Sequence, residues 1–93
     1  MSRQGFQSVW DAIEDSADQA ENMKLRSSLM IALAQTIERH QWNQEQAASA
    51  LGVTQPRISD LVRGKITLFS LDMLVNMAAA AGLQLELHIS EPA

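Results

Sequence analysis

Residues 44–61 read QEQAASALGVTQPRISDL, and this stretch decides the fold. It holds two short segments of helical character on either side of Gly52. Asn43 is a good N-cap and Gln46 follows three residues later, so a capping box predicts that the first helix begins directly after Asn43. Gly52 adopts a positive φ at little cost and therefore ends that helix with a change of direction. Thr54 then caps the second helix.

Each of the two segments has an apolar inner face at helical spacing. The inner positions are Ala47, Ala48 and Leu51 in the first segment, and Ile58, Leu61 and Val62 in the second. The small alanines allow a close approach of the two helices, Val53 fills the corner, and Gly64 ends the second helix. Two short helices joined in this way have the spacing that a helix-turn-helix needs to place its second helix in the major groove of DNA. The alternative is a helical pair without a DNA partner, but caps, turn, buried positions and polar face all agree with a helix-turn-helix.

The stretch resembles the lambda-repressor-like regulators of the xenobiotic-response-element (XRE) group. Their shared pattern is a Gln, two small residues, Leu-Gly-Val-Thr-Gln, then Ile-Ser-x-Leu and a closing Gly-Lys. From about Leu25 to Ile89 the chain is also similar to the HigA-like antitoxin branch, including residues 55–61, 63–65 and 69–71. The resemblance implies an autorepressing antitoxin that binds double-stranded DNA and a small basic ribonuclease toxin.

The composition favours a binding module and excludes several other classes. The 93 residues suffice for one domain, and they include no cysteine and only two histidines, His40 and His88. Neither histidine has a partner at metal-ligand spacing, and no phosphate loop or nucleophile motif is present. We therefore expect no enzyme activity, no metal and no cofactor. The lack of a signal peptide and of an apolar run of about 20 residues predicts a cytoplasmic protein without a membrane partner.

The net charge of −4 is unevenly distributed along the chain. Residues 1–23 hold one arginine against five acidic residues, whereas residues 24–68 hold six cationic residues against three acidic ones. The positive charge therefore coincides with the helix-turn-helix, which is what a DNA contact requires. Because the cations are few, we expect few phosphate contacts and modest non-specific affinity.

Three parts are predicted: an acidic helical segment at 1–17, a helix-turn-helix domain at 18–82 with its motif at 44–63, and a C-terminal strand and tail at 83–93. In the first part Phe6, Val9, Trp10 and Ile13 form an apolar stripe, which predicts a short helix at about 9–15. This helix either covers the core or docks on another subunit or a basic protein.

Two longer helices are predicted in the domain. A stripe of Leu25, Leu29, Leu33 and Ile37 predicts a helix from about residue 18 to residue 40. Between the motif and the last helix, Ile66, Leu68 and Phe69 are expected to cross the core. Ser70 is the predicted cap of a helix over 71–81, with Leu71, Leu74, Val75 and Ala78 on its inner face. Trp42, at the corner before the motif, is expected in the core.

The C-terminal segment alternates strictly between apolar and polar residues. Its apolar positions are Leu83, Leu85, Leu87 and Ile89. This period is typical of a strand with one buried face, and no second strand candidate exists in the chain. We therefore expect the strand to pair with its copy in a homodimer; pairing with a toxin, or packing on its own domain, are the alternatives. The predicted fold is mainly α: a lambda-repressor-like helix-turn-helix bundle of about five helices with a C-terminal β-strand.

A dimer would place two recognition helices about 34 Å apart, on successive turns of an inverted repeat. Gln55 and Arg57 are predicted to read base edges, with Ser59 and Asp60 as secondary candidates and Pro56 in apolar contact with a thymine methyl. Pro56 departs from many relatives, which have a polar residue there. Contacts to the DNA backbone are assigned to Gln44, Thr54, Arg63 and Lys65. In the free protein Asp60 is expected to pair with Arg57 or Arg63. The predicted function is a dimeric repressor; the alternative is an interaction protein that mainly neutralises a basic toxin.

Overall fold

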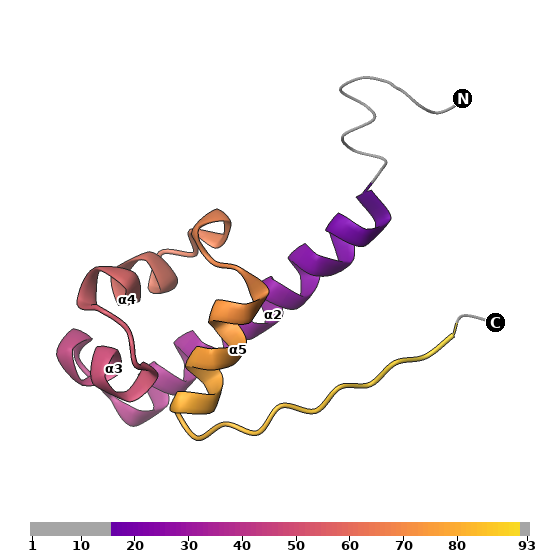
Figure 1. Ribbon diagram of the computed structural model, residues 1–93. Coiled ribbons are helices and arrows are strands. Elements are labelled where there is room, and N and C mark those ends of the chain that lie inside the picture. Colours follow the sequence, from indigo (N-terminus) through magenta and orange to yellow (C-terminus); the bar gives the residue numbers. More distant parts are fainter. Residues whose placement is uncertain (1–15, 92–93) are drawn as a thin grey trace.

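The computed structural model describes residues 16–91, and all regular structure within them is helical. The elements are α2 (Ser16–His40), α3 (Gln44–Leu51), α4 (Gln55–Val62), the 3₁₀ helix η1 (Ile66–Leu68) and α5 (Leu71–Ala80). Figure 1 shows one long helix, α2, with the shorter helices gathered along its C-terminal part. The first turns of α2 extend beyond this bundle, and α2 contacts α4, α5 and η1.

The predicted capping box begins α3. The Asn43 side chain accepts a hydrogen bond from the Gln46 backbone N–H at 2.8 Å, and the Gln46 side chain accepts one from the Asn43 N–H at 2.9 Å. At the other end Gly52 has φ 71°, in the left-handed region where glycine carries no Cβ penalty. Both ends of α3 are thus fixed by local contacts that the sequence predicts.

Loss of this capping box should have a measurable cost. We expect Asn43→Ala to lower the free energy of unfolding by about 1 kcal/mol, because the Gln46 N–H in the first turn of α3 loses its acceptor. Urea denaturation at one fixed protein concentration measures the change. Gln35→Ala, an exposed substitution within α2, is the control and should leave the midpoint nearly unchanged. An unaltered midpoint for Asn43→Ala would refute the role of this cap.

The other predicted caps are present too. Thr54 Oγ1 accepts a hydrogen bond from the Arg57 N–H at 3.4 Å and so begins α4, which has Pro56 in its first turn. Ser70 Oγ accepts one from the Met73 N–H at 3.1 Å and begins α5. Gly64, with φ 73°, follows α4 and allows the chain to turn toward η1.

One hydrophobic core joins the four α-helices. Its members are Met30, Leu33, Ile37, Ala47, Ala48, Leu51, Ile58, Leu61, Phe69, Leu74, Met77 and Ala78. Trp42 is half-buried against it and stacks on His40, with ring centroids 4.5 Å apart. Three predicted core residues of the domain are instead exposed, namely Val62, Leu68 and Val75. Leu25, on the predicted stripe of α2, is also 43% exposed and lines a groove beside α5 and the tail.

The predicted C-terminal strand is wrong. Residues 83–91 have no strand hydrogen bonds, although Figure 1 shows the segment leaving α5 as an extended chain. A strand exists through its ladder to a neighbouring strand, and residues 16–91 contain no such neighbour. The apolar positions of the tail do not form one buried face either. Leu83 is half-buried against the core, whereas Leu87 and Ile89 are 77% and 81% exposed.

The N-terminal predictions fall partly outside the structure. The proposed helix at 9–15 and its apolar stripe precede the described residues. The predicted boundary between residues 17 and 18 falls inside α2, which already includes Ser16. From residue 16 to residue 91, no helix is long and apolar enough to cross a membrane.

Candidate nucleic-acid interface

The candidate interface is the exposed surface of α4 together with the segments that adjoin its ends. Ile58 and Leu61 turn into the core and fix the helix on the bundle. Other positions of α4 and of its C-terminal end are exposed or half-exposed and mostly polar: Gln55, Pro56, Ser59, Asp60 and Arg63. Gln55, Ser59 and Arg63 are spaced four residues apart, so they share one face.

The two helices of the motif also bring their N-termini to the surface. Gln44 is the first residue of α3 and Gln55 the first residue of α4, and both side chains are exposed. The first N–H groups of a helix lack intrahelical acceptors and are suitable donors to a phosphate. Thr54, also exposed, immediately precedes α4. These three residues are therefore placed where contacts to a DNA backbone are possible.

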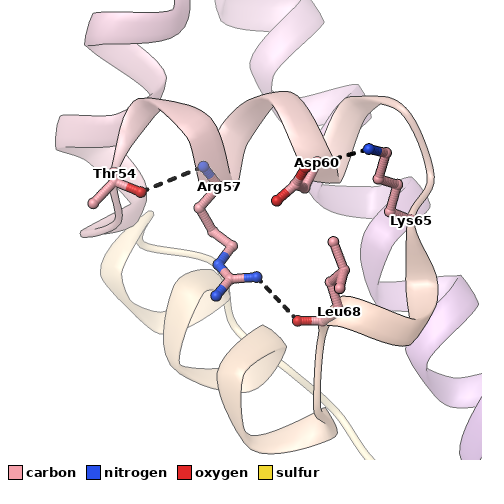
Figure 2. A network of polar contacts seen from close by, with 5 residues as sticks. All are labelled: Thr54, Arg57, Asp60, Lys65 and Leu68. Carbon is pink, nitrogen blue, oxygen red and sulfur yellow. Dashed lines mark hydrogen bonds and ion pairs between the residues drawn. The ribbon is translucent and has the colours of Figure 1, made fainter.

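Arg57 has intramolecular partners. Its Nη1 donates a hydrogen bond to the carbonyl oxygen of Leu68 at 3.1 Å, as Figure 2 shows. The guanidinium carbon lies 5.3 Å from the centroid of the Phe69 ring, a cation–π distance. Arg57 is half-buried in this position. In the free protein the guanidinium thus lies against η1 and Phe69.

A second arginine, which sequence reasoning missed, holds the same segment from α2. Arg26 Nη1 donates hydrogen bonds to the carbonyl oxygens of Ile66 and Phe69, each at 3.2 Å. Its Nε also donates to Asn22 Oδ1, one helical turn earlier, at 2.7 Å. The i, i+4 spacing of Asn22 and Arg26 is visible in the sequence, but the backbone carbonyls that Arg26 binds are forty or more residues away. No local pattern indicates such partners.

The ion pair of Asp60 differs from the predicted one. Its carboxylate lies 3.9 Å from Lys65 Nζ, not beside Arg57 or Arg63 (Figure 2). The Lys65 side chain is about half exposed, and an exposed pair of this kind is weak enough to exchange for a phosphate contact. Within residues 16–91 Arg63 makes no ion pair and is exposed. Arg63 and Lys65 are thus the cations near α4 that remain accessible to a nucleic acid.

Comparisons with known proteins place the chain in a family. The model of a helix-turn-helix domain family matches residues 12–90. A solved structure described as an XRE family transcriptional regulator is 31% identical, covers 80% of this chain and 83% of its own, and superposes with a TM-score of 0.72. No curated protein matches the chain. The residues that the family model matches include both α3 and α4. The chain therefore belongs to the helix-turn-helix domain family, in its XRE-like group.

Proposed function

We propose that this protein is a transcriptional regulator that binds an inverted-repeat operator as a dimer and represses its own operon. The observation that carries the proposal is α4. It is a helix capped by Thr54 and anchored by Ile58 and Leu61, and it carries a polar exposed face in a chain of the helix-turn-helix family. Helices with this anchoring enter the major groove and bring their first residues to base edges.

The proposed contacts follow the exposure of the side chains. Gln55 and Ser59 share one face of α4 and are assigned to base edges, since glutamine pairs well with adenine. Pro56 is exposed beside them and is suited to an apolar contact with a thymine methyl. Contacts to phosphates are assigned to the residues that flank this face: Gln44, Thr54, Arg63 and Lys65. Asp60 keeps Lys65 close to the helix until DNA is bound.

The contribution of Gln55 is directly testable. We expect Gln55→Ala to weaken operator binding by about 1–3 kcal/mol and to remove the preference at one base pair of each half-site. Fluorescence anisotropy with fragments of the protein's own promoter measures both effects. Gln35→Ala removes the same side chain from α2 and is the matched control. Equal affinity of both variants for every fragment would contradict the assignment of Gln55.

The dimer is supported by an apolar surface on the side of the molecule where the tail lies. A groove of about 380 Å³ opens between α2, α5 and the tail, and its lining is almost entirely apolar. The lining residues are Leu25, Ser28, Leu29, Leu71, Val75, Leu85, Glu86 and Leu87. Leu87 and Ile89 continue this surface along the exposed tail. We assign a second copy to it, because a single α4 reads one half-site and two-fold symmetry of the protein matches an inverted repeat.

The dimerisation residues in this proposal are Leu83, Leu85, Leu87 and Ile89, acting through side-chain packing. Tail and α4 lie on different sides of the bundle in Figure 1, so a dimer formed through the tail leaves both recognition helices accessible. Sedimentation velocity should show a dimer at micromolar concentration. A monomer that nevertheless bound an inverted repeat tightly would contradict this part of the proposal.

An antitoxin role is the finer part of the proposal. The similarity of residues 55–61 and 63–65 to HigA-like antitoxins supports it, and so does the charge of residues 1–23, where five acidic residues stand against one arginine. The partner we propose is a small basic protein encoded beside this one and bound in the cytoplasm; in both roles the protein acts by binding and not as an enzyme. Affinity capture from the native host, followed by mass spectrometry, tests it. Recovery of the protein with DNA but without a basic partner would leave repression as its sole role.

A further inference from the structure

The short helix η1 is held by two arginines that come from different helices. Arg57 of α4 binds the carbonyl oxygen of Leu68 at 3.1 Å, and Arg26 of α2 binds those of Ile66 and Phe69 at 3.2 Å. We call these three hydrogen bonds the arginine clamp. Because a charged guanidinium forms stronger hydrogen bonds than a neutral donor, the clamp fixes a segment whose own helical bonds are few.

The clamp also joins η1 to the core through Phe69. Only 1% of Phe69 is exposed, and its ring lies beneath the Arg57 guanidinium. Three interactions therefore hold η1 and Phe69 in place: burial of the ring, the cation–π contact and the hydrogen bonds to the carbonyl oxygens. The two bonds of Arg26 are partly buried, so water competes less for them than it does at the open surface, whereas the bond from Arg57 to Leu68 is exposed.

Arg57 connects the beginning of α4 with the segment after its end. Its backbone N–H binds Thr54 Oγ1 in the first turn of α4, while its side chain reaches Leu68, eleven residues later (Figure 2). Between them the chain leaves α4, turns at Gly64 and passes Lys65. The bond from Arg57 to Leu68 thus closes a loop that contains the recognition helix and its flanking cation. Such a closure fixes the direction of α4 relative to η1.

We infer that Arg57 is a positioning residue: together with Arg26 it holds η1 against α4 and sets the angle at which α4 meets DNA. This inference rests on the proposed function, and it takes Arg57 out of the set of base-reading residues. The guanidinium that would bind a guanine is the group that binds Leu68 and lies over Phe69. A bidentate contact to guanine that used Nη1 would give up the hydrogen bond to Leu68.

The test compares four variants: Arg57→Met, Arg57→Lys, Arg26→Met and the double variant Arg57→Met/Arg26→Met. Methionine keeps an unbranched apolar side chain but donates no hydrogen bond, whereas lysine keeps the charge and one donor to Leu68. Arg63→Met is the matched control, because it removes an exposed arginine just after α4 that makes no ion pair with residues 16–91. Anisotropy should be measured well below each variant's thermal midpoint, over a series of salt concentrations. The DNA set contains the operator and its single-base variants.

For a positioning role we expect Arg57→Met to bind all these DNA fragments more weakly by the same factor, about 2- to 30-fold, with base discrimination retained. The dependence of log K on log salt should keep its slope, because no phosphate contact is lost. Arg26→Met should show the same pattern. The double variant should lose less than the product of the single losses, and Arg57→Lys should recover part of the affinity. Arg63→Met should instead make this slope less steep, by the amount expected for the loss of about one phosphate contact.

Three results would overturn the inference. Loss of discrimination at a single base pair in Arg57→Met would make Arg57 a base reader, and a reduced salt slope would make it a phosphate ligand. Unchanged affinity of the folded variant would leave Arg57 with a role in stability alone.

Amide hydrogen exchange of the free protein separates failure of the inference from failure of the proposed function. The Leu68 and Phe69 N–H groups bind carbonyls within and next to η1, and both should exchange faster in Arg57→Met and Arg26→Met. Unchanged exchange, alongside normal DNA binding by the unsubstituted protein, would refute the clamp alone. If the unsubstituted protein bound no DNA, the proposed function would fail and the positioning role with it. This would hold even if faster amide exchange in the variants showed that the arginine clamp exists.

Discussion

Replacing Phe69 by alanine is expected to lower the free energy of unfolding by about 3–5 kcal/mol. The side chain is almost fully buried, so the substitution removes its packing and leaves a cavity in the hydrophobic core. A domain of this size has about 5–15 kcal/mol of stability in all, so the loss is a large part of the total. Urea denaturation at a fixed protein concentration measures it.

Leu33→Ala is the comparison that isolates the second effect of Phe69. Leu33 is fully buried in α2 and takes no part in the arginine clamp. Both substitutions should destabilise strongly, about 2–5 kcal/mol for the leucine. At a temperature where both variants are folded, only Phe69→Ala should also weaken DNA binding, because only it removes the ring beneath Arg57. A loss of less than about 1 kcal/mol for Phe69→Ala would be incompatible with its burial.

The pair Leu87→Asp/Ile89→Asp is expected to convert the proposed dimer into a monomer. It places two charges in an apolar surface that a second copy would bury, and an unpaired buried charge is costly. Each half-site would then be bound by a separate molecule. Affinity for the inverted repeat should therefore fall by at least about 100-fold, as for a bivalent ligand that loses one arm. Sedimentation velocity and anisotropy measure the two effects on the same samples.

A matched control is available in the same tail. Gln84→Asp/Ser90→Asp adds the same charge to polar, exposed positions and leaves the apolar stripe intact. It should remain dimeric and keep most of its affinity for DNA. If the two double variants reduced DNA binding by the same factor, repulsion between the added charges and DNA would account for the loss. If Leu87→Asp/Ile89→Asp stayed dimeric, the interface would lie elsewhere on the molecule.

The local parts of the fold could be predicted from the sequence. The Asn43 capping box, the Thr54 and Ser70 caps and the left-handed Gly52 depend on residues within a few positions of one another, and all are present. The start of α4 and its buried pair, Ile58 and Leu61, follow from the same local spacing. Short-range hydrogen bonds and helical periodicity are therefore readable without a structure.

The parts that could not be predicted depend on contacts distant in the sequence. The partners of Arg57 and Arg26 are backbone carbonyls of a segment whose path only the folded chain defines. Leu25 belongs to the predicted stripe of α2 but lines an open groove instead of the core, which helical periodicity alone does not reveal. The prediction of a strand at 83–89 was wrong for a related reason. Alternation indicates that apolar side chains share one face, but a strand also needs a neighbouring strand to which it is hydrogen-bonded.

Because Arg26 and Arg57 bind backbone carbonyls of their own chain, they affect how strongly such a regulator binds DNA outside its operator. Arg26 and Arg57 keep their charge, but the N–H groups bound to carbonyls are not free to donate to phosphates, and the net charge of −4 weakens the attraction to arbitrary DNA further. Non-operator sites outnumber operators by many orders of magnitude. Weak binding to these sites therefore leaves most protein molecules free in solution. Under the proposed function, a small number of copies per cell would then suffice to keep one operator occupied.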